Sequence, residues 1–214
     1  MGQKMDAIET IELYARYSAL LARRMATTLV EGFRSAFTVD GSVRDTLFRE
    51  RGITLAKGGH YSRAATLLEP LLAAHPTDPE IMLHLGMSYL RTGRQEDGIR
   101  LLEKMQAMRG DIKSATALGI AYCQVGRDEQ AIPLLQRAAE ANSDNFNIRY
   151  RLGVAFDNVG RHEKAIECLQ EALELRPEDA RAYRAIAFAY EQKGDHETAV
   201  GYFKRASELE EGKV

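Results

Sequence analysis

The sequence predicts an all-α protein built as a solenoid of antiparallel helix pairs. Three observations lead to this fold class. A unit of about 34 residues recurs five times along the 214-residue chain. Within each half of the unit, apolar residues fall three and four apart, which is the spacing of one helical face. A glycine separates the two halves in every copy, where it suits the left-handed end of a helix.

Residues 1–44 precede the clear repeats and fit the unit poorly. One period before the first clear copy, Ser18 and Val30 occupy the two positions where the helices of a repeat approach most closely, so we expect a degenerate leading repeat. Its first helix has one apolar face, formed by Ile8, Ile11, Tyr14, Tyr17 and Leu21. A capping box at Thr28 to Glu31 opens its second helix, and Asp40-Gly41-Ser42 ends the segment.

The five clear copies cover residues 45–213. Their first residues are Asp45, Pro79, Ile112, Phe146 and Ala180. The glycine between their two helices is Gly59, Gly93, Gly126, Gly160 and Gly194. Small residues recur at the eighth and twentieth positions, as Gly153 and Ala165 do in the stretch LGVAFDNVGRHEKAIECLQEALELRPED. No P-loop lysine follows these glycines, so they predict close helix packing rather than a phosphate-binding loop.

The recurring Leu-Gly, Tyr, Ala, Leu or Phe, Ala and Pro pattern resembles the tetratricopeptide repeat over residues 45–213. The resemblance implies a right-handed superhelix with a concave and a convex face. Repeats one and two then occupy residues 45–111, and repeats three to five occupy residues 112–213. The second repeat is one residue short and ends at Arg109, Gly110 and Asp111 without a proline. Glycine adds backbone freedom, so residues 109–113 are the predicted hinge.

The resemblance also implies which residues line the concave groove. The ninth position of every repeat is apolar, as Ile53, Met87, Ile120, Val154 and Phe188. Leu83, Leu90 and Tyr150 extend this apolar stripe. The basic residues around it are Arg49, Lys57, Arg91, Lys113, Arg181 and Arg184. A contiguous exposed apolar surface usually marks an interaction site, so we expect a groove for an amphipathic, slightly acidic helix. The alternative is that the stripe is covered in cis or packs between first helices.

Charge and composition exclude several other functions. Lys and Arg total 29 against 31 Asp and Glu, and this balance provides no field for nucleic acid. The two cysteines, Cys123 and Cys168, lack partners at zinc-site spacing. The histidines are scattered and form no catalytic motif, so we expect no enzyme, cofactor or metal site. No apolar run reaches membrane-spanning length, and the acidic start of the chain differs from a signal peptide. A cytosolic protein is therefore expected.

A second resemblance covers nearly the whole chain. The stretches ELYARYSALLARRM, EGFRSAF, RYRLGVAFDNVGR and RAIAFAYEQKGDHETAV are similar to a family of magnetosome-associated repeat proteins. The resemblance implies a scaffold that coats the cytosolic face of the magnetosome membrane, assembles with itself through its leading repeat and recruits other magnetosome proteins. Contact with the membrane would then be indirect, through a protein receptor. The alternative is a monomeric adaptor whose N-terminal helices cap its own groove and whose client is another protein.

Overall fold

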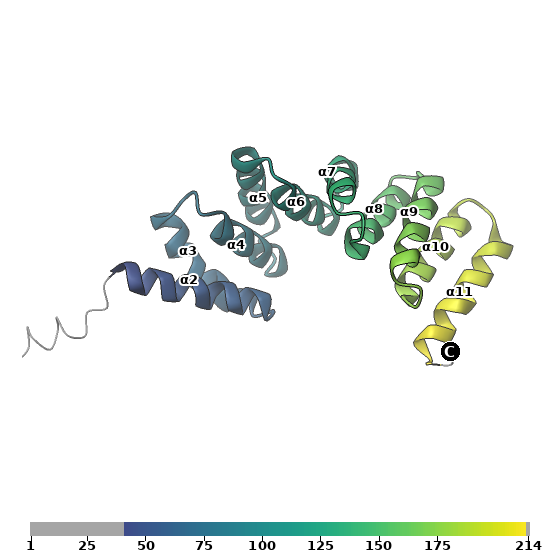
Figure 1. Ribbon diagram of the computed structural model, residues 1–214, viewed down its shortest axis with the longest axis horizontal. Coiled ribbons are helices and arrows are strands. Elements are labelled where there is room, and N and C mark those ends of the chain that lie inside the picture. Colours follow the sequence, from purple (N-terminus) through teal and green to yellow (C-terminus); the bar gives the residue numbers. More distant parts are fainter. Residues whose placement is uncertain (1–40, 213–214) are drawn as a thin grey trace, which may run out of the picture. The chain divides into compact units, whose positions relative to one another are not determined.

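A computed structural model describes residues 41–212, and every regular element in that range is an α-helix (Figure 1). The chain divides into two compact units, Met1–Leu47 and Phe48–Val214, each described by itself. The described part of the first unit is the start of α2 (Gly41–Lys57). The predicted leading helix, with Ile8, Ile11, Tyr14, Tyr17 and Leu21, lies outside the described residues.

The helices follow the period of the sequence. After α2 come α3 (Tyr61–Ala74), α4 (Pro79–Arg91), α5 (Gln95–Arg109), α6 (Ile112–Gln124), α7 (Asp128–Ala141), α8 (Phe146–Asn158), α9 (His162–Leu175), α10 (Ala180–Gln192) and α11 (His196–Glu210). Four of the predicted repeat starts, Pro79, Ile112, Phe146 and Ala180, are each the first residue of a helix. The fifth, Asp45, lies inside α2, because α2 already begins at Gly41. The predicted all-α solenoid is confirmed.

Local chemistry explains where the helices begin and end. Asp78, Asp111, Asn145 and Asp179 each precede an even-numbered helix, and each side chain accepts a hydrogen bond from a backbone N–H of the first turn. Such caps satisfy donors that have no partner within the helix. The glycine between the two helices of each repeat has a positive φ, between 73° and 85°. This left-handed conformation confirms the predicted role of those glycines.

Within the second unit, each helix from α3 onward packs against the next one along the chain (Figure 1). The even-numbered helices α4, α6, α8 and α10 also contact one another in turn. The core between the layers contains Leu68, Leu102, Leu135 and Leu169, the large residues of the second helices, all fully buried. Each of them lies against the small residue at the eighth position of the first helix. The repeat pattern of the sequence is therefore a packing pattern.

The two helices of the second repeat approach each other most closely through two glycines. A Cβ built on Gly98 of α5 would lie 2.7 Å from the carbonyl oxygen of Gly86 on α4 and 3.0 Å from Cγ of Leu90. The other repeats have alanine where Gly98 stands. Glycine at this position is therefore required by the backbone approach, and Leu90 fills the space beside it.

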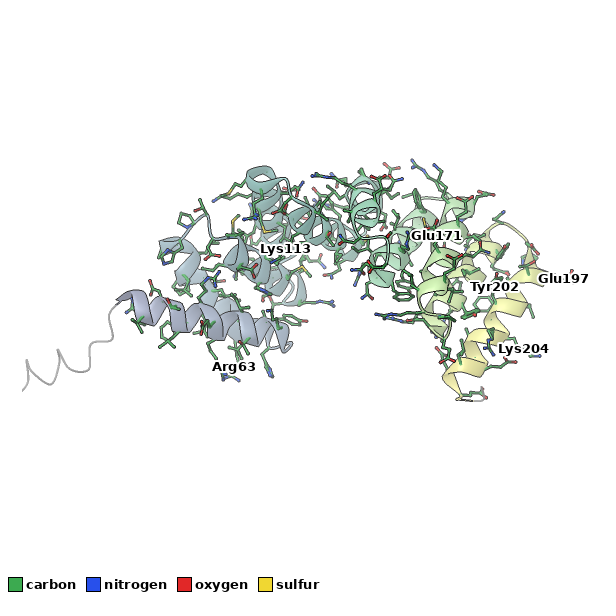
Figure 2. The ribbon with its side chains drawn as sticks, viewed as in Figure 1. Arg63, Lys113, Glu171, Glu197, Tyr202 and Lys204 are labelled. Carbon is green, nitrogen blue, oxygen red and sulfur yellow. The ribbon has the colours of Figure 1, made fainter. Side chains whose placement is uncertain are left out.

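The last helix, α11, has two different faces. Tyr202 points back toward α10, whereas Glu197 and Lys204 point away from it (Figure 2). The ring of Tyr202 stacks on Tyr190 of α10 at a centroid distance of 5.5 Å and lies 6.2 Å from the ring of Tyr183. These aromatic contacts attach α11 to the rest of the solenoid.

Candidate protein-binding groove

The helices α4, α6, α8 and α10 contact one another in turn and present one face, which we call the groove. Met87, Ile120 and Val154 lie on this face as half-buried side chains, and Phe188 of α10 is 50% exposed. Ile53 on α2 is also half-buried. The periodicity of a helix places these ninth-position residues on one side of their helices, and contacts between α4, α6, α8 and α10 bring the helices together.

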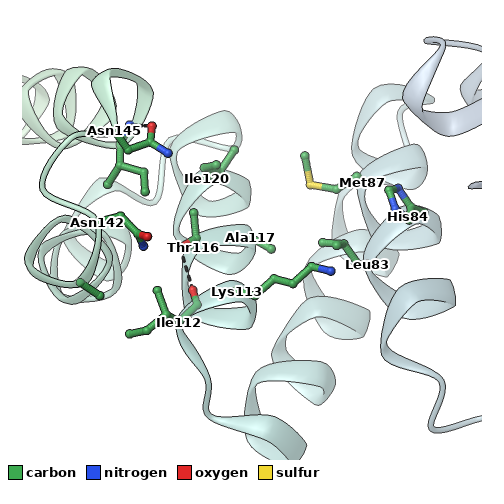
Figure 3. A pocket seen from close by; sticks show the side chains of 12 residues that line it. Leu83, His84, Met87, Ile112, Lys113, Thr116, Ala117, Ile120, Asn142 and Asn145 are labelled. Atoms are coloured by element: carbon green, nitrogen blue, oxygen red, sulfur yellow. Dashed lines mark hydrogen bonds between the residues drawn. The ribbon is translucent and has the colours of Figure 1, made fainter. Parts of the chain in front are cut away.

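One hollow of the groove has a volume of about 710 Å³ and lies between α4, α6 and the turn from α7 to α8 (Figure 3). We call it the α4–α6 hollow. It is lined by Leu83, His84, Met87, Ile112, Lys113, Thr116, Ala117, Ile120, Ala141, Asn142, Asn145 and Ile148. Most of this lining is apolar. Figure 3 shows Lys113 extending from α6 toward Leu83 on the α4 side.

A second hollow of about 380 Å³ lies between α8 and α10. Its lining is Tyr150, Val154, Asp157, Asn158, Arg181, Arg184, Ala185, Phe188 and Gln192. Phe188 is held edge-on against Phe203 of α11, with ring centroids 5.1 Å apart. Tyr150 stacks on Phe146 at 5.8 Å, and the guanidinium of Arg181 lies 5.6 Å from each of these two rings. This hollow is more polar than the first one and has a positioned aromatic floor.

Most of the basic residues around the groove have carboxylate partners. Arg49 lies 2.8 Å from Asp78, and Arg181 lies 2.7 Å from Asp179. Lys113 pairs with Glu80, and Arg184 pairs with Glu210. These pairs reduce the basic character that the sequence predicts for the rim. An incoming segment would therefore be attracted chiefly by apolar surface, since exposed ion pairs contribute little.

Two of these carboxylates have lowered pKa values. The hydrogen bond from Lys113 holds the pKa of Glu80 below its usual range, against the opposing effect of burial. Burial alone would raise the pKa of Asp78, but the hydrogen bonds from Arg49 and from the backbone N–H groups of Ile81 and Glu80 lower it overall. Both groups therefore stay ionised near neutral pH and remain available to their basic partners.

Most of the groove residues predicted from the sequence line one of the two hollows, and the others lie elsewhere. Leu83, Met87, Lys113 and Ile120 line the α4–α6 hollow. Tyr150, Val154, Arg181, Arg184 and Phe188 line the second hollow. Arg49 and Ile53 are half-buried on α2, while Lys57 and Arg91 are exposed and line neither hollow. Leu90 is placed differently from the expectation: only 7% of it is exposed, because it packs against Gly98 in the contact between α4 and α5.

Several lining residues were missed by reasoning from the sequence. Ile112, Thr116, Asn142, Asn145 and Ile148 come from helix starts and from the turn between α7 and α8. Their position beside Met87 depends on how one repeat is placed on the next. The apolar character of Ile112 and Ile148 near helix starts was the one available signal.

The predicted hinge has a defined geometry. Gly110 ends α5 with a φ of 60°. Arg109 pairs with Asp111 at 2.6 Å, and Asp111 accepts a hydrogen bond from the backbone N–H of Ser114. The hydroxyl of the buried Ser114 donates to the Gln106 side chain at 2.6 Å. The Arg-Gly-Asp tripeptide therefore forms a capped turn between α5 and α6.

Metal ligands and thiols are the two kinds of reactive site that the structure tests over residues 41–212. Within residues 41–212, no three His, Cys, Asp or Glu side chains gather closely enough to hold a metal ion. Burial raises the pKa of the Cys123 thiol to about 12 and that of Cys168 to about 11, so neither forms a thiolate near neutral pH. No helix in this same range is long and apolar enough to cross a bilayer.

Comparison with protein families identifies the class of repeat. A tetratricopeptide repeat model matches residues 49–111 and 116–167. A TPR repeat model matches residues 159–194, and another tetratricopeptide repeat model matches residues 180–213. The chain therefore belongs to the tetratricopeptide repeat family, as its packing pattern indicates, and this membership indicates a protein-interaction scaffold.

Two curated relatives of the chain are named magnetosome protein MamA. The chain is 46% identical over 81 residues to magnetosome protein MamA of Paramagnetospirillum magnetotacticum, and 45% identical over 81 residues to that of Magnetospirillum gryphiswaldense. Each match covers 38% of this chain and 37% of the relative.

Solved MamA structures extend the similarity to most of the fold. One from strain MSR-1 is 47% identical with a TM-score of 0.74, and it covers 80% of this chain and 99% of its own. One from strain AMB-1 is 49% identical with a TM-score of 0.73, and it covers 77% and 98%. The protein is thus homologous to MamA, as the resemblance of its sequence indicated.

Proposed function

We propose that this protein is a non-enzymatic scaffold that assembles with copies of itself through residues 1–44 and binds partner proteins through the groove. Its relatives are named magnetosome proteins. We therefore place it on the cytosolic face of the magnetosome membrane, as a peripheral coat. Other magnetosome-associated proteins are its further partners, and a protein receptor mediates its contact with the membrane.

The accessible apolar surface of the groove is the observation that carries this proposal. Met87, Ile120, Val154 and Phe188 lie on one face, and two hollows open beside them. In a soluble protein, apolar surface concentrated in concave sites usually meets a partner. An amphipathic helix that lays its apolar face into the groove would bury these side chains.

Residues 1–44 have the chemistry of such a partner. Ile8, Ile11 and Tyr14 recur at helical spacing, with Asp6, Glu9 and Glu12 among them. The apolar residues match the floor of the groove. The acidic residues are compatible with Lys57 and Arg91, the two predicted rim cations that are exposed and line neither hollow. Residues 1–44 of one copy would dock into the groove of the next, so the two copies use different surfaces and the interface is heterologous. Such assembly continues beyond two copies unless the geometry closes a ring.

Charges placed on the floor of the groove test the proposal. We expect Met87→Glu and Ile120→Lys to lower the mass of the assembly measured by light scattering, since each puts a charge into the α4–α6 hollow. The matched control is Val200→Lys, which changes a 66% exposed valine on α11 and should leave the mass unchanged. Circular dichroism checks that all three variants fold. Wild-type mass for both groove variants would contradict the proposal.

A further inference from the structure

The α4–α6 hollow contains a histidine that the repeat packing does not explain. His84 lies on α4 and is among the residues that line the hollow. Figure 3 shows its ring beyond Leu83 and Met87 as seen from α6. Its side chain is only 15% exposed, and its Nε2 atom lies 3.5 Å from Oε2 of Glu80. Of the five histidines in the sequence, it is the one that lines either hollow.

The hollow is close to electrically neutral while His84 carries no charge. Lys113 is paired with Glu80, and the remaining lining residues are apolar or uncharged. Asn145 accepts a hydrogen bond from the backbone N–H of Ile148, and Asn142 donates to the carbonyl oxygen of Ala138. A large uncharged side chain can enter such a space without leaving a buried charge unpaired.

The surroundings of His84 favour its neutral form. Burial lowers the pKa of His84 most, and the charges of Lys57 on α2 and Lys113 on α6 lower it further, while Glu80 on its own helix opposes them. Glu80 is already held by Lys113, so it compensates only in part. Filling the hollow with an apolar side chain would remove more water from the imidazole and disfavour the charged form again.

We infer that the α4–α6 hollow selects one large uncharged apolar side chain from residues 1–40 of a second copy, and accepts it only while the imidazole of His84 is neutral. This inference rests on the proposed self-assembly. In this inference, pH controls the assembly through the protonation state of His84. Protonation places a cation in the wall of the hollow and expels the apolar side chain.

The direction of the pH dependence follows from linkage. The pKa of His84 in the free groove lies below its ordinary value, and occupation lowers it further, so the occupied groove binds fewer protons than the free one. Assembly is therefore strongest at neutral and alkaline pH. Below the pKa of the free groove, the affinity falls by up to about tenfold per pH unit at each site. Residues 1–40 contain no histidine, so they provide no competing imidazole titration.

Light scattering on the full chain between pH 8 and pH 5.5 tests this inference with two variants. We expect the wild-type mass to fall toward that of a monomer as the pH decreases, while His84→Gln keeps its neutral-pH mass throughout. His196→Gln is the matched control: His196 is paired with Glu191 at 2.8 Å on the surface, so this variant should follow the wild type. Circular dichroism at pH 5.5 shows whether each chain is still folded.

The outcomes of this experiment distinguish a role for His84 in assembly from self-assembly itself. A wild-type assembly whose mass does not change with pH, or a His84→Gln variant that dissociates as the wild type does, would overturn the role of His84 and leave self-assembly standing. A full chain that is monomeric at pH 8 would overturn both.

Discussion

Gly153 of α8 and Leu169 of α9 lie so close that no side chain fits between them. A Cβ built on Gly153 would be 2.6 Å from Cγ of Leu169 and 3.1 Å from the carbonyl oxygen of Ala165. Leu169 and Ala165 are both fully buried. Gly153 is therefore a contact point between the two helices of the fourth repeat, as the sequence predicts.

The first prediction concerns this contact. Gly153→Ala should lower the free energy of unfolding by about 1–3 kcal/mol, because the added Cβ would overlap the fully buried Leu169 and the backbone of Ala165. Urea denaturation measures the change. The matched control is Gly201→Ala, at a helical glycine of α11 whose added Cβ would meet nothing within 4 Å. That variant should be more stable by about 0.5–1 kcal/mol, and equal effects of the two variants would contradict the prediction.

The second prediction concerns a larger side chain at Ala165 of α9, opposite Gly153 in the same contact. Ala165→Leu should overpack the space between α8 and α9 and destabilise the protein by about 1–3 kcal/mol. Ala107→Leu, at an exposed position of α5, introduces the same side chain where nothing confines it and should change stability little. Unchanged melting temperatures for both variants would show that the close contact is absent.

The third prediction concerns pH and the cap of α6. The hydrogen bond from the Ser114 backbone, the pairing with Arg109 and the Ser114 hydroxyl together lower the pKa of Asp111 from 3.8 to about 2. Because this pKa is lowered, the Asp111 carboxylate binds a proton less readily in the folded state than in the unfolded state. The stabilisation is therefore present above pH 4 and is lost as the pH falls from 4 toward 2.

Asp111→Asn isolates this effect, because asparagine keeps a cap oxygen but cannot ionise. The stability difference between wild type and variant should be constant above about pH 5 and should shrink below pH 4. Urea unfolding at each pH at which both chains are folded gives this difference. A difference that does not vary with pH would contradict the assignment.

The fourth prediction concerns bending at residues 109–113. Repeats one and two meet repeats three to five at Gly110, whose left-handed conformation ends α5 and whose lack of a side chain gives the backbone freedom to bend. With both native cysteines replaced by alanine, spin labels at Lys104 on α5 and Gln136 on α7 span this junction. Labels at Gln136 and Gln170 on α9 span the next one. We expect a broader distance distribution across the first pair, and equal widths would exclude a hinge.

Local residue patterns were enough to predict most of the fold. Pro79, Ile112, Phe146 and Ala180 begin helices as expected, because the cap before each one and the glycine after each first helix are local signals. Gly98 stands where the other four repeats have alanine. The carbonyl of Gly86 explains it, but that approach of two backbones depends on tertiary packing and has no local signal.

The groove was predicted less completely, because its surface depends on how the repeats are placed on one another. The apolar ninth positions were visible from helical spacing. The carboxylate partner of Lys113 lies on another helix, at Glu80, so a count of basic residues overestimated the charge of the rim. His84 was one of five scattered histidines in the sequence, and its place in the hollow depends on how α4 and α6 pack.

The molar mass of the full chain at tens of micromolar tests the central claim, assembly through residues 1–44 and the groove, most directly. We predict a mass well above that of one 23.9 kDa chain, and a folded monomer when residues 1–44 are removed, since the five remaining repeats have a core of their own. A full chain that is monomeric, together with a truncated chain that aggregates, would contradict self-assembly and indicate that residues 1–44 cap the groove of their own chain.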